Sequence, residues 1–313
     1  MIKRILISII VISSLFFVIL KCNKNKFTVN EMHICYVLDD GYTEPTLVSI
    51  SSLIRHAKKG NKIALHIVDT GISEEGKEKF RKLVNAYNKN NRSVPVTLEI
   101  VQYDISIFDN ISQKKWGRNI FVKFVLQDIF PSLDKIIYLD GDMIIAGSLS
   151  ELWNIDLKDN YWAGIVHAMK QTHCVGTMLI NLKAFRQDDM AKKLIEKTLD
   201  GQEKLKQEKS QKKITEEYAL NTLCKSKDKT INRILTLPFR YNMHLGYTIK
   251  NRKYINDEIK QQILSEIPNI IVYHYSSKNK PWKISWHEFA KRINPTYYDL
   301  WHEEAAICRE ILK

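Results

Sequence analysis

The order of apolar runs along the chain is the sequence feature that most constrains its fold. Short β-rich runs alternate with stretches of helical periodicity: the predicted strands are 33–38, 64–68, 96–101 and 135–139, and the predicted helices are 47–57, 73–88 and 120–130. This order favours parallel strands joined by right-handed crossovers. We therefore predict an α/β fold, with a mostly parallel sheet flanked by helices on both faces.

Length and composition fit one large domain of this kind. The chain has 313 residues, of which 44% are hydrophobic and 27% are charged, and it has no internal repeat. This composition excludes a disordered chain, and five cysteines are too few for a disulfide scaffold. The net charge of +13 suits a partner that carries phosphate. No nucleic-acid-binding motif accompanies this charge, so we expect no nucleic acid partner.

The first 30 residues have a composition of their own. Two basic residues precede an uncharged run over 5–20, after which lysines return. A spanning helix needs about 20 apolar residues and a signal-peptide core about 7 to 15, so length leaves both open. No small-x-small cleavage site follows, and Lys21 before Cys22 argues against lipoprotein processing. We predict a single-pass membrane protein with residues 1–30 as anchor and stalk, of either orientation.

Acidic pairs follow two of the predicted strands, where the ligands of parallel sheets bind. Asp39-Asp40 follows the first strand, and Asp140-Gly141-Asp142 follows the strand 135–139. Two convergent carboxylates repel each other unless a cation lies between them, so the second pair indicates a hard divalent ion, Mn²⁺ or Mg²⁺. A capped turn with solvated acids would produce the same pattern.

A histidine late in the chain adds a third candidate ligand. His274 follows a predicted strand over 270–273. An imidazole ligand favours Mn²⁺ over Mg²⁺. Lys280 lies six residues further on, before Pro281 and Trp282, which would stiffen the loop and direct its ammonium group at a diphosphate. The alternative for His274 is a core histidine with satisfied hydrogen bonds.

Five ordered motifs resemble the retaining nucleotide-sugar glycosyltransferases of family 8, which include bacterial lipopolysaccharide galactosyl- and glucosyltransferases and glycogenin. The resemblance covers about residues 32–285. Its motifs are LDDGY (38–42), IVDTGIS (67–73), YLDGD (138–142) leading to LSELW (149–153), GTMLINL (176–182) and HYSSKNKPW (274–282). It implies a GT-A type, Rossmann-like fold in a single large domain, a UDP-sugar donor and a divalent metal.

The resemblance also implies ligands for the metal and the diphosphate. Asp140, Asp142 and His274 would bind Mn²⁺, with Mg²⁺ as the alternative, and Lys280 would contact the diphosphate. Ser277 stands where the family has a glycine in the donor-binding His motif. Together these positions predict how the nucleotide end of the donor is held.

Other positions matching the family would contact the nucleoside and the sugar. Asp39 would recognise the uracil or ribose beside Val37, and Tyr42 would lie near the base. Lys123 stands where the family usually has arginine and would contact the donor sugar or the diphosphate. A solvated helix lysine is the alternative for Lys123.

Glu216 and Glu217 match the family's Asp-Gln pair beside the anomeric carbon. They are the predicted catalytic residues, together with Lys123, and would stabilise or attack an oxocarbenium-like sugar. The family implies retention of configuration, by front-face attack or through a covalent species, and the sequence leaves both routes open. The alternative is a helix N-terminus that favours acidic residues.

Three departures from the family pattern bear on sugar and acceptor recognition. Gly41 replaces the usual Asn, Ser277 replaces a Gly, and Cys174-Val175-Gly176 replaces Asn-Ser/Ala-Gly. The segment 165–174 is also shorter than in the lipopolysaccharide enzymes, where an insertion helps to close over donor and acceptor. We therefore expect an acceptor that differs from theirs.

These observations predict a metal-dependent retaining glycosyltransferase that moves a hexosyl or pentosyl group from a UDP-sugar to a glycan, glycolipid or glycoprotein. The alternative is a catalytically inactive, membrane-tethered family member that binds UDP-sugar or glycan. The predicted regions are the anchor, the transferase domain over 31–284 and a helical tail over 285–313. The tail interleaves aromatic and basic residues, which would suit an anionic membrane surface or packing against the domain.

Overall fold

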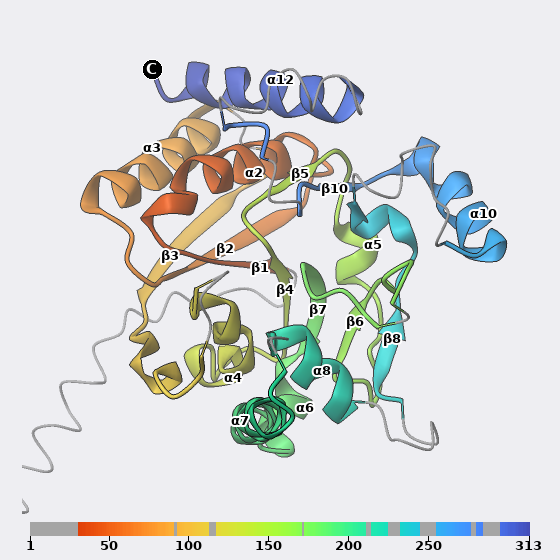
Figure 1. The fold of residues 1–313 in the computed structure, drawn as a ribbon. Helices are drawn as coiled ribbons and strands as arrows, with labels where there is room; N and C mark the ends of the chain where they lie inside the picture. The colour runs from red at the N-terminus through yellow and green to blue at the C-terminus, as the bar shows by residue number, and fades with distance from the viewer. Residues whose placement is uncertain are drawn as a thin grey trace, which may run out of the picture. The chain divides into compact units, whose positions relative to one another are not determined.

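A seven-stranded sheet, in the order β3-β2-β1-β4-β7-β6-β8, forms the centre of the fold (Figure 1). The computed structural model describes residues 31–90, 93–112, 117–170, 172–210, 214–224, 232–244, 255–276, 280–283 and 295–313. The strands of this sheet are β1 (Glu31–Leu38), β2 (Lys62–Asp69), β3 (Val96–Gln102), β4 (Lys135–Leu139), β6 (Trp162–Gly164), β7 (Thr177–Asn181) and β8 (Ile234–Thr236). The four strands predicted from the early part of the chain are confirmed as β1 to β4.

The sheet is mostly parallel, as predicted, and its one reversal has a local cause. The pairs β2–β3, β1–β4 and β6–β8 are parallel, whereas β7 is antiparallel to both β4 and β6. The described residues between β6 and β7, 165–170 and 172–176, form no crossover helix, and a connection of this kind returns the chain in the opposite direction. The reversal brings this connection to the end of the sheet where β4 finishes, since the Asp140 amide donates to the Gly176 carbonyl.

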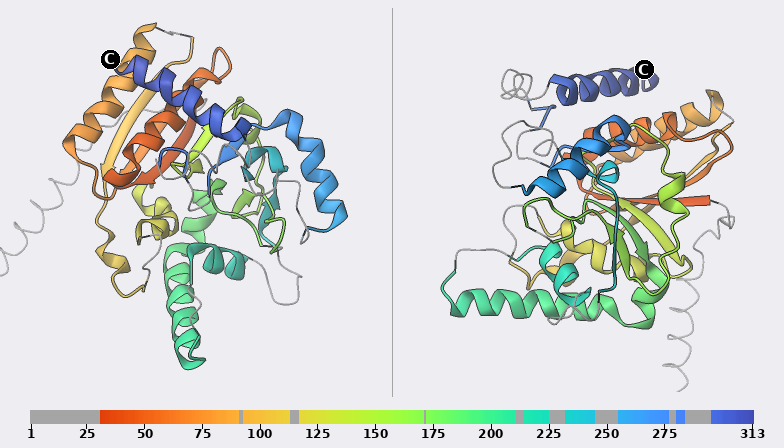
Figure 2. Two further views of the ribbon diagram at one scale, coloured as in Figure 1. Left: turned by 45° about the horizontal axis from the view of Figure 1, so that its top comes forward. Right: turned by 90° about the vertical axis from the view of Figure 1, so that its right-hand side faces the viewer.

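Helices cover both faces of the sheet, which divides the core into two layers (Figure 2). Alternate residues of β4 point to opposite layers: Ile137 and Leu139 belong to one, Ile136 and Tyr138 to the other. Both faces are therefore apolar, as in a sheet buried on both sides. The helices are α2 (Thr43–Arg55), α3 (Glu74–Asn90), α4 (Leu126–Ile129), α5 (Ser150–Trp153), α6 (Leu182–Gln187), α7 (Met190–Gln207), α8 (Glu216–Cys224), α10 (Asp257–Glu266) and α12 (Pro295–Ile311).

A second, three-stranded sheet crosses the end of β4. It consists of β5 (Met143–Ile145), β10 (Val272–His274) and β9 (Met243–His244), in the order β5-β10-β9. Here β10 is antiparallel to β5 and parallel to β9. The late strand predicted over 270–273 begins two residues later and ends one residue later than expected, so His274 is its last residue rather than the first residue after it.

The predicted helix over 120–130 is divided in two. Asn119–Phe124 is a 3-10 helix, η3, and the α-helical turn α4 follows it. Phe121, Val122, Lys123 and Phe124 are all buried, so the segment has no solvent-facing side of the kind that an amphipathic α-helix needs. The tighter helix directs Lys123 into the protein.

The described part of the tail packs against the domain. In α12, Tyr297, Trp301, Ala305 and Cys308 are buried at helical spacing and belong to the core layer that contains α2. Arg55 of α2 forms an ion pair with Glu304 of α12 at 2.5 Å. Figure 1 shows α12 lying over α2 and α3. The tail was expected either to lie on an anionic membrane surface or to pack against the domain, and these residues pack against the domain.

The predicted single-pass membrane localisation is wrong for the part of the chain that the structure describes. None of its helices combines the length and the apolar character needed to cross a bilayer. The run 5–20, on which the prediction rested, lies outside the described residues. The boundaries proposed at residues 30 and 284 stay predictions.

Two histidines and a glutamate form a hydrogen-bonded row across three neighbouring strands. Nδ1 of His33 lies 3.0 Å from Nε2 of His66, and Nδ1 of His66 lies 2.9 Å from Oε2 of Glu99. Burial, and then the neighbouring His66, lower the pKa of His33 to about 4, against a smaller opposing effect of Glu99. The native fold therefore disfavours a proton on His33.

This row predicts a loss of stability in mild acid. The unfolded chain takes up a proton on His33 near pH 6.5, but the folded chain takes it up only near pH 4. The free energy of unfolding should thus fall as pH drops through this window, by up to about 3 kcal/mol from this group. Urea denaturation of the wild type and of His33→Gln measures it. The variant should show a flatter pH dependence, and equal slopes would contradict the assignment.

Candidate active site

A cavity of about 380 Å³ opens at the carboxyl ends of β1 and β4. Val37 and Tyr42 line one side of it, the segment 140–142 lies in the middle, and the segment 174–176 with Glu216 and Glu217 lines the other side. His274 and Lys280 complete the wall. The cavity therefore lies where the topology of a parallel sheet predicts a ligand.

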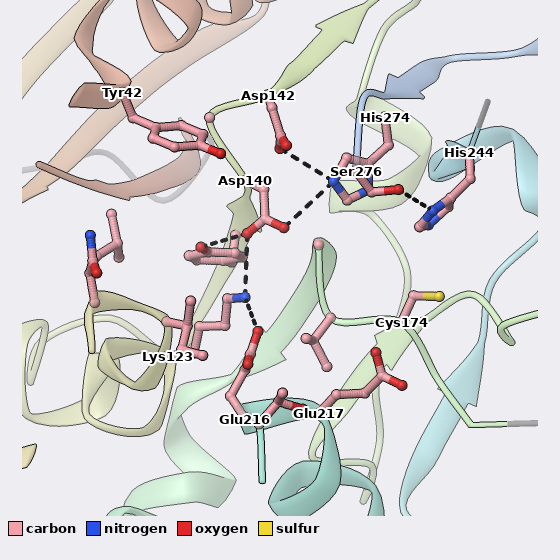
Figure 3. Close-up of a pocket in the computed structure, with 18 of the residues that line it drawn as sticks. Tyr42, Lys123, Asp140, Asp142, Cys174, Glu216, Glu217, His244, His274 and Ser276 are labelled. Atoms are coloured by element: carbon pink, nitrogen blue, oxygen red, sulfur yellow. Dashed lines mark hydrogen bonds and ion pairs between the residues drawn. The ribbon is translucent and has the colours of Figure 1, made fainter. Parts of the chain in front are cut away.

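Asp140, Asp142 and His274 converge at this place (Figure 3). One candidate ligand atom from each lies within 4.8 Å of the others, and no other set of three or more acidic, histidine or cysteine side chains does so among the described residues. Nε2 of His274 is 3.7 Å from Oδ2 of Asp140 and 3.3 Å from Oδ1 of Asp142. Carboxylate oxygens with one imidazole nitrogen form a donor set suited to a divalent metal ion.

Backbone pairing explains why these three residues meet. The antiparallel register places His274 opposite Met143, and the Tyr275 amide donates to the Asp142 carbonyl. Gly141 lies between the acids because a Cβ there would come 2.3 Å from Oγ1 of Thr46. Close approach to α2 thus requires this glycine.

A buried lysine compensates the charge of Asp142. Nζ of Lys280 lies 2.5 Å from Oδ2 of Asp142 and 2.7 Å from the Tyr275 carbonyl oxygen, and both side chains are buried. Burial raises the pKa of the Asp142 carboxyl, but the charges of His274 and Lys280 and their hydrogen bonds outweigh it and hold that pKa well below its usual range. Asp142 is therefore an ionised, buried acid.

Lys123 is fully buried, not solvated on a helix surface. Its Nζ lies 3.3 Å from Oδ1 of Asp140 and 3.1 Å from Oε1 of Glu216. Burial lowers the pKa of Lys123, but the two acids reverse this and raise it. Burial raises the pKa of Glu216 in spite of Lys123. The hydroxyl of Tyr138 donates to the same oxygen of Asp140, at 2.8 Å.

Glu217 has a different environment from its neighbour. It is half-buried, its Oε1 accepts from Oγ1 of Thr172 at 2.9 Å, and Nζ of Lys170 lies 4.0 Å from that oxygen. Asn221, one turn further along α8, bonds to both backbone groups of His173. These contacts dock the connection 165–176 on α8, and so Glu217 belongs to the wall opposite Val37.

The nucleoside-binding prediction is only partly reflected in the cavity lining. Val37 and Tyr42 line the cavity, whereas Asp39 is not among its lining residues and accepts a hydrogen bond from Nδ2 of Asn119, which does line it, at 3.1 Å. The predicted donor contact Ser277 lies outside the described residues.

A family model described as glycosyl transferase family 8 matches residues 33–285. The chain belongs to this family. The match spans the whole region in which the motifs resembled it.

Relatives of this family-8 chain cover most of its length. A Haemophilus influenzae protein is 28% identical over 84% of this chain and 75% of its own length. A lipopolysaccharide 1,2-glucosyltransferase of Escherichia coli is 25% identical over 85% of this chain and 76% of its own. Homologues and fold therefore identify this family-8 protein as a glycosyltransferase, an enzyme that transfers a sugar.

Solved structures confirm the GT-A fold. The galactosyltransferase LgtC, in complex with donor and acceptor sugar analogs, superposes with a TM-score of 0.66 at 20% identity and covers 88% of this chain and 95% of its own. The bifunctional glycosyltransferase WbbM superposes with a TM-score of 0.68 at 17% identity over 92% of this chain, which spans about half of that protein.

Two residues beside this family-8 site carried no sequence signal. Asn242 and His244 lie next to His274 because β9 pairs with β10. Asn242 Oδ1 lies 2.7 Å from Nδ1 of His274, and the rings of His244 and His274 lie 4.7 Å apart between centroids with an interplanar angle of 54°. A two-residue strand has no periodicity to find, so only the fold reveals these residues.

The buried charge at Lys123 predicts a large loss of stability in Lys123→Met. Removal of the cation leaves Glu216 buried and unpaired, and breaking a buried pair costs about 3–5 kcal/mol. The double variant Lys123→Met/Glu216→Gln should regain part of this. Urea denaturation measures both.

An exposed lysine provides the control for this comparison. Lys79 pairs with Glu75 on the surface of α3, and Lys79→Met should cost no more than about 1 kcal/mol. A similarly small cost in Lys123→Met would show that Lys123 is not needed to compensate the acids.

Proposed function

We propose that this glycosyltransferase transfers a hexosyl or pentosyl group from a UDP-sugar to a glycan, glycolipid or glycoprotein, with retention of the anomeric configuration. It would use a divalent metal ion, with Mn²⁺ preferred over Mg²⁺. The observation that carries the proposal is the convergence of Asp140, Asp142 and His274 within 4.8 Å beside the cavity. The nitrogen ligand favours Mn²⁺ over Mg²⁺.

The residues present fit such an ion. Two carboxylates and an imidazole nitrogen offer three ligands, and Asp140 retains enough exposure for a donor phosphate to approach. Gly176 supports this use, since a Cβ there would lie 2.5 Å from Cε1 of His274 and 2.9 Å from Oδ2 of Asp140. When bound, the metal would neutralise charge that develops on the leaving diphosphate.

The chain's own side chains would do the rest. The base would lie beside Val37 and Tyr42, and the diphosphate would draw the ammonium group of Lys280, which now contacts Asp142. The sugar would then lie towards Glu216 and Glu217. Such an arrangement would place the ammonium group of Lys280 beside the leaving group before reaction.

The two glutamates would have different tasks. Glu216 shares Lys123 with Asp140 and is buried, so it would shape the field around the sugar. Glu217 is more exposed and reaches the cavity from the other side, and its carboxylate would stabilise or attack the oxocarbenium-like carbon. Front-face attack and the covalent route would both need these two carboxylates beside the sugar.

Asp142→Asn tests the metal site. We expect loss of Mn²⁺-dependent transfer and of donor hydrolysis by at least about 100-fold, because a ligand charge is lost at a site built around it. Asp69→Asn is the control, since Asp69 is an equally buried acid that caps a turn outside the cavity. It should lower stability and retain metal dependence. Full activity in Asp142→Asn would reject the assignment.

A thermal-shift screen tests the donor. UDP-glucose, UDP-galactose, UDP-xylose and UDP-N-acetylglucosamine are compared, each with and without Mn²⁺. A ligand at 100 times its Kd stabilises the fold by about 2.7 kcal/mol, so the true donor should raise Tm by several degrees, and only with metal. If no UDP-sugar stabilises the protein, the donor class is wrong. Stabilisation without turnover would indicate an inactive binding protein instead.

A further inference from the structure

Asn242 holds the ring nitrogen of His274 that faces away from the two acids. Its side-chain oxygen Oδ1 lies 2.7 Å from Nδ1 of His274. Asn242 is completely buried between the 3-10 helix η4 (Phe239–Tyr241) and β9. Because β9 pairs with β10, Met243 lies beside Tyr273 and His244 beside His274. The register therefore fixes the amide next to the imidazole.

This contact determines which nitrogen of His274 carries the proton. An amide oxygen is only an acceptor, so Nδ1 must donate a hydrogen to it. In the neutral ring Nε2 then has a lone pair, and Nε2 is the atom directed at Asp140 and Asp142. A metal ligand needs this tautomer.

Without the amide, the acids would favour the opposite tautomer. Oδ1 of Asp142 lies 3.3 Å from Nε2 and would accept a hydrogen from it. A proton on Nε2 must leave before that nitrogen can bind an ion. An acceptor at Nδ1 is thus what keeps Nε2 ready for a metal in the presence of two carboxylates.

We infer that Asn242 is a positioning residue that sets the tautomer and orientation of His274 for metal binding. The inference rests on the proposed function, because it assigns Asn242 a task in the same metal site. A neutral amide performs it without adding a further negative charge beside Asp140, Asp142 and Glu216.

Stability alone does not account for an asparagine here. Nδ2 of Asn242 is buried and has no hydrogen-bond partner in the described part of the chain. A buried amide nitrogen without a partner is unfavourable for stability. Among the described residues, the contact to His274 is the one hydrogen bond that the side chain of Asn242 makes.

Metal affinity in two Asn242 variants tests the inference. Free Mn²⁺ is titrated by electron paramagnetic resonance against the full chain, alone and with UDP. We expect Asn242→Leu to bind Mn²⁺ about 10- to 100-fold more weakly, the usual effect of losing such a partner. Asn242→Asp keeps an acceptor oxygen and should stay within about threefold of the wild type. Asn242→Leu leaves Nδ1 of His274 without its acceptor, so its Tm should fall as well. The control variant below shows whether a fall in Tm alone weakens metal binding.

Asn221→Leu is the matched control. Asn221 is also buried and bonds to the backbone of His173, away from His274. This variant should lose thermal stability and keep the wild-type Mn²⁺ affinity. Weakening of metal binding in Asn221→Leu as large as in Asn242→Leu would contradict a specific role for Asn242.

The tautomer itself can be observed without metal. Nitrogen-15 NMR of the histidine rings in the metal-free wild type should show a proton on Nδ1 of His274. An Nδ1 without a proton, or a folded Asn242→Leu that binds Mn²⁺ within twofold of the wild type, would overturn the inference. If the wild type binds no Mn²⁺ with or without UDP, the proposed function fails instead, and the NMR result still decides the tautomer. If Asn242→Leu does not fold, Asn242→Asp and the wild-type spectrum decide.

Discussion

Compensation of buried negative charge is the interaction on which the site depends. Asp142 and Glu216 are both buried, and each lies within hydrogen-bond distance of a buried lysine, Lys280 and Lys123 respectively. Unpaired, either acid would carry a desolvation cost large enough to protonate it or to unfold its surroundings. The pairing keeps Asp142 ionised, places a cation beside Glu216 and so holds two cations in the cavity wall. A donor with negatively charged phosphates would therefore meet both the acids and the two lysines of the cavity wall.

The junction between the two sheets gives this wall its rigidity. The chain leaves the large sheet at Leu139 and enters the small one at Met143, so the acids occupy the short passage between them. On one side the Asp140 amide is bonded to the Gly176 carbonyl, and on the other the Asp142 carbonyl accepts from Tyr275. Ligands anchored on paired strands move less than ligands on loops, which suits a site that must hold its geometry through a reaction.

The connection between β6 and β7 forms one wall of the cavity. Asn221 and Glu217 of α8 hold it against the body of the protein. It also brings Cys174 to the cavity, where the family pattern has asparagine. A thiol is a weaker hydrogen-bond donor and acceptor than an amide, so Cys174 offers this wall less hydrogen bonding than an asparagine would.

The sequence by itself determined the strands β1 to β4, the apolar faces of the sheet and the acids that follow β4, because these depend on local periodicity and on the end of a strand. It also identified His274 and Lys280, through motifs. The tertiary structure alone decided that Lys280 contacts Asp142, that Lys123 lies buried between Asp140 and Glu216, and that Asn242 supports His274. Each of these contacts joins segments at least 17 residues apart. They arise from the register between strands and from burial, and neither of these produces a repeating pattern of residues that could be recognised in the sequence.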